Sequence, residues 1–217
     1  MAFIDLPAAN GLRLYCAEPA APGPGVLVLH AWWGLVPDVL GVCDRLAANG
    51  FLAVAPDLYG GKVASTPEEA EALVEAGDWQ SRQAMTAAAI RWLQGHSALA
   101  PKRVALLGFS LGGAVAIRAA ANGLGDAVIT FYGSIEPGGP IRIPLLGLYA
   151  ETDPFEPAEE VAALLKRLEG EGTPVSAITY PGTGHWFFEE SRSAYDPVAA
   201  QAAWDESLRF LRRHLQG

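Results

Sequence analysis

Ser110 lies at the centre of a glycine-flanked pentapeptide, Gly108–Gly112, with the sequence G-F-S-L-G. The apolar run 104–107 precedes it, and an alanine-rich stretch, 112–121, follows it. A strand, a sharp turn and a helix in this order expose the hydroxyl of the central serine at the edge of a sheet, beside the N–H groups of the helix N-terminus. The pattern predicts an acyl-transfer nucleophile at Ser110. The alternative is a serine that only caps the helix after a glycine turn.

A serine hydroxyl needs a neighbouring base, and that base needs a carboxylate to orient it. His185 is the expected base, because it comes shortly after the apolar run 175–180. Asp153 is the expected carboxylate, in the loop that follows the run 144–149. The chain order serine, acid, histidine is the one found in a widespread class of α/β enzymes. We therefore expect a Ser110–His185–Asp153 triad.

Three other side chains compete for these roles. Glu151 remains a second choice for the acid, whereas Glu156 is expected to cap the next helix. His30 also follows an apolar run, but it precedes the serine and so breaks the expected order. We expect His30 to hold its loop by a side-chain hydrogen bond.

The loop after the run 26–30 is expected to supply one oxyanion-binding N–H, that of Trp32, and the residue after the nucleophile, Leu111, the other. Segments 58–79 and 186–195 are expected to shape the substrate pocket. Aromatic side chains near predicted strand ends are candidates for its walls, with ordinary core packing as the alternative. These are Trp32, Trp33, Tyr59, Tyr132, Trp186 and Phe187.

Short apolar runs alternate with helical patterns along the chain. Strands are expected at 26–30, 51–55, 103–108, 127–131, 144–149 and 175–180, with 12–16 as an additional edge strand. Helices are expected at 38–49, 66–77, 78–94, 112–121, 157–169 and 196–215. Continuous apolar strands that alternate with helices predict an α/β fold, a mostly parallel sheet of about seven strands with helices on both faces.

The composition fits a single globular domain over 1–217. Of its 217 residues, 51% are hydrophobic and 18% are charged, which excludes a disordered chain. A net charge of −9 disfavours a nucleic-acid partner. Two cysteines without a pairing motif indicate a reducing compartment, and neither a signal peptide nor a membrane span is visible, so we expect a cytoplasmic protein. No cofactor or metal is expected, and the chain is expected to be a monomer or a homodimer.

Taken together, five motifs resemble those of the dienelactone hydrolase family. They are the segments 30–35 (HAWWGL), 55–59 (APDLY) and 108–113 (GFSLGG), Asp153, and the pair Gly184-His185. The resemblance covers about residues 10–215. It implies a compact α/β-hydrolase fold without a large cap domain, and an activity on carboxylic esters or lactones.

Three positions depart from the best-known members of that family. Those members have a cysteine nucleophile where this chain has Ser110, and a glutamate that controls the cysteine's ionisation where this chain has Ala31. They also bind a substrate carboxylate through arginines, one of them four residues after the histidine, where this chain has Glu189. Arg192 lies close by in sequence and is the candidate to replace it.

The leading hypothesis is a serine esterase or lactonase that acts on small molecules through an acyl-serine intermediate. A thioesterase or an acyltransferase working on the same site is an alternative. A non-catalytic binding protein that retains the fold is another, because fold alone does not establish function.

Overall fold

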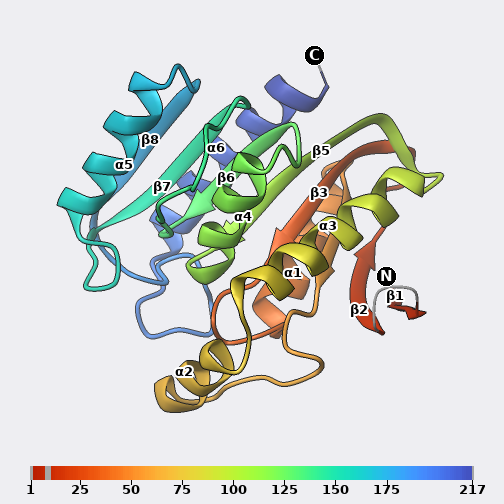
Figure 1. The fold of residues 1–217 in the computed structure, drawn as a ribbon, viewed down its shortest axis with the longest axis horizontal. Helices are drawn as coiled ribbons and strands as arrows, with labels where there is room; N and C mark the ends of the chain where they lie inside the picture. The colour runs from red at the N-terminus through yellow and green to blue at the C-terminus, as the bar shows by residue number, and fades with distance from the viewer. Residues whose placement is uncertain (1, 8–10, 217) are drawn as a thin grey trace.

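The computed structural model of the chain describes residues 2–7 and 11–216 and shows an eight-stranded sheet in the order β1-β2-β4-β3-β5-β6-β7-β8 (Figure 1). β1 and β2 run antiparallel to each other, β2 runs antiparallel to β4, and all remaining neighbours are parallel. The strands are β1 (Ala2–Leu6), β2 (Leu12–Ala17), β3 (Gly23–Leu29), β4 (Leu52–Pro56), β5 (Leu99–Phe109), β6 (Ala127–Phe131), β7 (Leu145–Thr152) and β8 (Val175–Gly184).

The predicted α/β fold with a mostly parallel sheet is confirmed, but the sheet has one strand more than the expected number. β1 was not predicted, because its side chains are mostly exposed and Asp5 ends its short apolar stretch. It is recognised only by its pairing with β2, where Ala2 lies opposite Cys16.

The described residues form six helices: α1 (Pro37–Ala48), α2 (Pro67–Glu75), α3 (Trp79–Gly95), α4 (Leu111–Ala121), α5 (Ala158–Gly170) and α6 (Pro197–Leu215). α1 and α6 pack on one face of the sheet and α3, α4 and α5 on the other (Figure 1). α1 begins one residue earlier than expected, with Val36 as its N-cap. Asp38 therefore lies in the first turn, where its carboxylate is free to accept a hydrogen bond from the N–H of Ser191.

Successive residues of the central strands contribute to two separate cores. Val26 and Val28 of β3 face α1 and α6, whereas Leu27 and Leu29 face α3 and α4. Side chains of a strand alternate between its two faces, so a strand buried on both sides must be apolar at every position. This explains the uninterrupted apolar runs in the sequence.

Strand register brings the chemically interesting loops together. Phe109 pairs with Phe131, so the residues that follow, Ser110 and Tyr132, leave the sheet side by side. β8 runs four residues further than predicted, to Gly184, and after a register shift Thr152 of β7 pairs with Gly184. Asp153 follows Thr152 of β7 and His185 follows Gly184 of β8, so these two residues lie at neighbouring strand ends.

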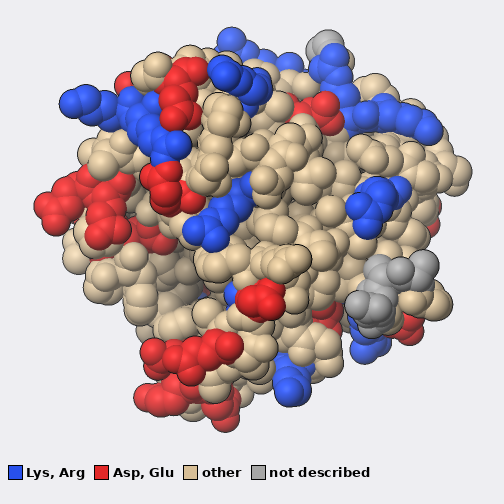
Figure 2. Space-filling view, in the orientation of Figure 1, with Lys and Arg blue, Asp and Glu red and all other residues tan. Residues whose placement is uncertain are grey.

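Acidic side chains gather over α2, at the lower edge of the view in Figure 2. α2 carries four glutamates, Glu68, Glu69, Glu71 and Glu75, and no basic residue. None of the helices within residues 2–7 and 11–216 is both long and apolar enough to cross a lipid bilayer.

Candidate active site

Ser110 occupies the sharp turn between β5 and α4, with φ 49° and ψ −115°. Its N–H donates to the carbonyl of Phe131 at 2.9 Å, which ties the turn to the neighbouring strand. The flanking glycines are required by close backbone approach. A Cβ on Gly108 would collide with the carbonyl of Gly112, and one on Gly112 would collide with the carbonyl of Leu29. The G-x-S-x-G sequence is therefore the one that lets this strained turn pack against β3.

His185 connects the serine to Asp153. Its Nε2 lies 3.0 Å from Ser110 Oγ, and its Nδ1 lies 2.6 Å from Asp153 Oδ2. The side chains of His185 and Asp153 are each only 3% exposed. The other carboxylate oxygen of Asp153 accepts hydrogen bonds from the N–H groups of Phe155 and Glu156, at 2.9 and 3.1 Å. The carboxylate is thus fixed by its own loop while it orients the imidazole.

The structure separates the competing acids from the histidine. Glu151 is exposed and accepts a hydrogen bond from the N–H of Gly182, at 2.9 Å. Glu156 accepts a hydrogen bond from the hydroxyl of Ser134. Glu156 does not cap α5, whose N-cap is Pro157. Of the three carboxylates considered, only that of Asp153 contacts His185.

His30 is fully buried and contacts backbone groups on both sides of its ring. Nδ1 lies 2.7 Å from the carbonyl of Ala31, and Nε2 accepts from the N–H of Leu58 at 3.1 Å. Burial lowers the pKa of His30, so the imidazole is neutral with its proton on Nδ1. His30 therefore holds the loop that begins at Ala31 against the loop that begins at Asp57. Asp57 stabilises its own turn by accepting from the N–H groups of Tyr59 and Gly61.

Two backbone N–H groups beside the serine are available to a ligand. Outside helices and strands, and within the described chain, no hydrogen bond is donated by the N–H of Trp32 or of Leu111. Leu111 begins α4, and Trp32 lies in the loop held by His30. Both residues line the same pocket as Ser110. Both N–H groups therefore belong to residues that share a pocket with the Ser110 hydroxyl.

Backbone strain is concentrated around His185. The described non-glycine residues with positive φ are Ser110, Tyr132 and Trp186, at 49°, 35° and 66°. Ser110 is hydrogen-bonded to the imidazole of His185, and the ring of Tyr132 packs with its centroid 4.8 Å from that of the imidazole. Trp186 follows His185 in the sequence and packs edge-on against it. Left-handed conformations of such residues persist only where surrounding packing holds them, and they cluster at functional sites.

A pocket of about 270 Å³ opens onto Ser110, and we call it the Ser110 pocket. Six residues named from sequence line it: Trp32, Ser110, Leu111, Glu156, His185 and Trp186. Sequence reasoning did not single out the remaining lining residues, although the first two lie inside the segment 58–79 that it expected to shape the pocket. They are Val74, Trp79, Ala114, Ser134, Ile135 and Phe155. Phe155 had one available signal, its position two residues after the triad acid.

Other aromatic candidates lie elsewhere. Trp33 and Phe187 are 4% and 0% exposed and belong to the core between the sheet and the helices α1 and α6. Tyr59 packs edge-on against His30, with the ring centroids 5.0 Å apart. Tyr132 is fully buried beneath His185. In each case the ring packs against neighbouring aromatic or apolar groups of the protein, and none lines the Ser110 pocket.

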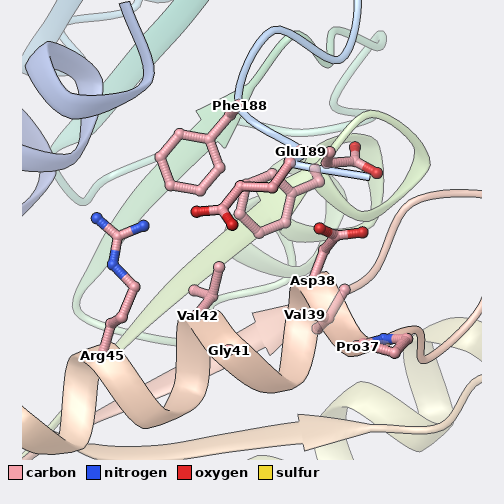
Figure 3. Close-up of a pocket in the computed structure, with 10 residues that line it drawn as sticks. Pro37, Asp38, Val39, Gly41, Val42, Arg45, Phe188 and Glu189 are labelled. Atoms are coloured by element: carbon pink, nitrogen blue, oxygen red, sulfur yellow. The ribbon is translucent and has the colours of Figure 1, made fainter. Parts of the chain in front are cut away.

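Arg192 also lies away from the Ser110 pocket. Its guanidinium stacks on the ring of Trp33, 3.8 Å from the centroid, and its Nε lies 3.8 Å from Glu189. Glu189 lines a separate cavity of about 240 Å³ against α1, the Glu189 cavity, which Asp38 and Arg45 also line (Figure 3). It accepts a hydrogen bond from Tyr132 at 2.9 Å. Burial raises the pKa of Glu189 to about 7.

Comparison with known proteins agrees with this arrangement. The family model described as the dienelactone hydrolase family matches residues 12–215. The chain belongs to the dienelactone hydrolase family. Membership supports a hydrolase of the esterase or lactonase kind, and the predicted resemblance is confirmed.

Two relatives of this dienelactone hydrolase family member align over nearly their full lengths. The protein usf of Aquifex pyrophilus is 34% identical, over 95% of this chain and 96% of its own. A Bradyrhizobium protein described as a probable 2-oxo-3-(5-oxofuran-2-ylidene)propanoate lactonase is 31% identical, and the alignment covers 100% of this chain and 96% of that protein. The solved structure of a dienelactone hydrolase-like promiscuous phosphotriesterase from metagenomic libraries superimposes with a TM-score of 0.86 at 21% identity. The superposition covers 99% of this chain and 98% of that one. That last likeness shows the α/β-hydrolase fold.

Proposed function

We propose that the protein is a serine hydrolase that cleaves small carboxylic esters or lactones through an acyl-Ser110 intermediate. The observation that carries the proposal is the continuous hydrogen-bonded chain from Asp153 through His185 to Ser110, with distances of 2.6 and 3.0 Å. A nucleophile, a base and an orienting acid in contact form the arrangement that acyl transfer by serine requires.

In the first half of the reaction, Ser110 Oγ attacks the carbonyl carbon while its proton passes to Nε2 of His185. Asp153 keeps the imidazole proton on Nδ1 and stabilises the imidazolium. The carbonyl oxygen becomes an oxyanion that accepts hydrogen bonds from the N–H groups of Trp32 and Leu111. When the tetrahedral intermediate collapses, the bond to the alcohol oxygen breaks and His185 returns the proton to that oxygen.

The second half repeats these steps with water. His185 takes a proton from the water as the water oxygen attacks the acyl carbon. When the bond between the acyl carbon and Ser110 Oγ breaks, His185 returns the proton to Oγ and the acid leaves. A lactone follows the same route, except that its alcohol stays attached to the acid. The His30 contacts support this reading, because they fix the loop that carries Trp32 before any substrate binds.

The pocket supports a small substrate. Its volume of about 270 Å³ lies just below the usual range for ligand sites, and aromatic rings of Trp32, Trp79, Phe155 and Trp186 form much of its wall. The printed name of the Bradyrhizobium relative supports the inclusion of lactones among the substrates to be tested.

The test is turnover of short-chain p-nitrophenyl esters and five- and six-membered lactones by the wild type and by Ser110→Ala. We expect kcat for the best substrate to fall by about 10⁴–10⁶ in the variant, because the nucleophile itself is removed. Ser191→Ala is the matched control. Ser191 hydrogen-bonds Asp38 outside the Ser110 pocket, so its loss should change kcat less than about threefold.

Retention of near-wild-type turnover by folded Ser110→Ala would contradict the proposal. Adding a thiol ester substrate or an alcohol acceptor to the same assay separates hydrolysis from the two acyl-transfer alternatives by the product formed.

A further inference from the structure

Two polar side chains face an otherwise aromatic part of the Ser110 pocket. Glu156 and Ser134 line the pocket together with Phe155, Ile135 and the triad residues Ser110 and His185. The mechanism uses neither Glu156 nor Ser134. A polar pair in an apolar pocket is the kind of feature that fixes which substrates fit.

Glu156 is held in place from two directions. Its N–H donates to Asp153 at 3.1 Å, and its carboxylate accepts from the hydroxyl of Ser134. Ser134 follows β6 and Glu156 precedes α5, so the contact joins two loops at neighbouring strand ends. The carboxyl group therefore has a fixed position close to the catalytic acid.

The Ser110 pocket lacks a cation to balance this acid, as far as the described chain shows: its lining contains no lysine or arginine. Arg167 faces Glu156 from an adjacent cavity, where it is paired with Glu136 and Glu171. Arg82 donates to the carbonyls of Gly77 and Val74. Arg192 is engaged by Trp33 and Glu189, as described above. Arg118 stacks on the ring of Trp79, 4.2 Å from its centroid, and does not itself line the pocket.

The surroundings of the pocket are acidic as well. Val74 of α2 lines it, and α2 presents the four exposed glutamates that Figure 2 shows at the lower edge. Charges of one sign around a cleft raise the local concentration of oppositely charged ligands and lower that of like-charged ones.

We propose that Glu156, positioned by Ser134, makes the enzyme prefer cationic and neutral esters over esters that carry a carboxylate. This inference rests on the proposed function and names the substrate class of the same site.

The preference should depend on pH, because burial raises the pKa of Glu156 to about 7, with Asp153 and Glu160 raising it further and Ser134 lowering it. Glu156 is thus largely neutral at pH 6 and negative at pH 8, so the preference for cations should grow between these values. The groups that face it are Asp153, His185, Glu160, Tyr149, Glu136 and Arg167. Turnover of every ester uses His185 in the same way, so its contribution cancels in a ratio of two substrates.

The experiment uses three p-nitrophenyl esters with acyl chains of matched length that end in a tert-butyl, a trimethylammonium or a carboxylate group. The first two are isosteres, and all three keep their charge between pH 6 and 8. We measure kcat/KM for each at pH 6, 7 and 8, with enzyme-free rates subtracted. For the wild type, the ratio of the cationic to the anionic ester should rise several-fold over this range, with its midpoint near pH 7.

Glu156→Gln keeps an acceptor for Ser134 and removes the charge. At pH 8 it should lower the cationic-to-anionic ratio about tenfold, as expected for one partly screened charge a few ångströms from the substrate. It should also remove the pH dependence of the ratio. Glu159→Gln is the matched control, because Glu159 is exposed on α5 and lines neither cavity that contains Glu156, so the ratio should stay near that of the wild type.

A wild-type ratio that is flat from pH 6 to 8, or a ratio in folded Glu156→Gln equal to that of the wild type, would overturn this role of Glu156. A different result is expected if the proposed serine hydrolase function is itself wrong. In that case none of the three esters shows turnover that depends on Ser110, and the inference about Glu156 is wrong as well.

Discussion

The Ser110 pocket and the Glu189 cavity are similar in two respects that often mark a functional site. Their volumes are about 270 and 240 Å³. Each also contains a glutamate whose pKa burial raises to about 7, Glu156 in the first and Glu189 in the second. Size and a perturbed carboxyl group therefore do not tell them apart.

The two cavities differ in what their polar groups are bonded to. In the Glu189 cavity, Glu189 accepts from Tyr132 and Asp38 accepts from Ser191. In the Ser110 pocket, the hydrogen-bonded chain ends at the Ser110 hydroxyl. Beside it lie the N–H groups of Trp32 and Leu111, for which the described residues show no acceptor outside helices and strands. The comparison teaches that reactive groups left free for a ligand, more than volume or burial, indicate where chemistry can take place.

The largest expected effect contrasts one aspartate from each region. Asp153→Asn should lower kcat by about 10³–10⁴, because the amide no longer favours the imidazole tautomer that accepts the proton of Ser110. Asp38→Asn keeps an acceptor for Ser191 and lies outside the Ser110 pocket, so kcat should change less than about threefold. Both values come from steady-state ester hydrolysis at saturating substrate. An equal loss in the two variants would break the distinction between the regions.

A smaller effect concerns the stability contribution of Glu189. Its folded pKa of about 7 lies above that of an unfolded glutamate, so the folded state binds this proton more tightly. The stabilisation of the folded state that comes from this tighter proton binding is fully present below about pH 4 and is lost as pH rises through 7. Glu189→Gln accepts from Tyr132 without a titrating charge. Relative to the wild type, its free energy of unfolding should rise by on the order of 2 kcal/mol between pH 5 and pH 8.

Urea unfolding of the wild type and of Glu189→Gln, at pH 5 and at pH 8, measures this difference in the free energy of unfolding. Glu190→Gln is the control, because the neighbouring Glu190 is exposed and its replacement should leave the pH dependence unchanged. If Glu189→Gln and the wild type differ by the same amount at both pH values, Glu189 is ionised throughout in the folded protein.

Much of the triad could be predicted from the sequence, because each member follows an apolar run that must be a buried strand. Parallel strands end at one edge of the sheet, so Ser110, Asp153 and His185 had to meet there. Chain order excluded His30, the expected cap role set Glu156 aside, and Glu151 stayed open as the acid. The structure shows all three in other hydrogen bonds.

The pocket walls could not be predicted in the same way. Trp79 and Trp33 are both tryptophans near strand ends or loops, yet one lines the pocket and the other is buried in the core. Which way each ring points depends on loop conformation, such as the left-handed backbone of Trp186, and no periodicity encodes it. β1 was missed for a related reason, since its exposed residues carry no burial pattern.

The central claim is that Ser110 is a nucleophile activated by His185. The most direct measurement is labelling by a fluorophosphonate probe, which requires no knowledge of the substrate, followed by peptide mass mapping of the wild type and of His185→Ala. The account predicts one adduct, on Ser110, formed by the wild type and at least about 10³-fold more slowly by the variant. Absence of labelling in the folded wild type, or equal labelling rates in the two proteins, would contradict it.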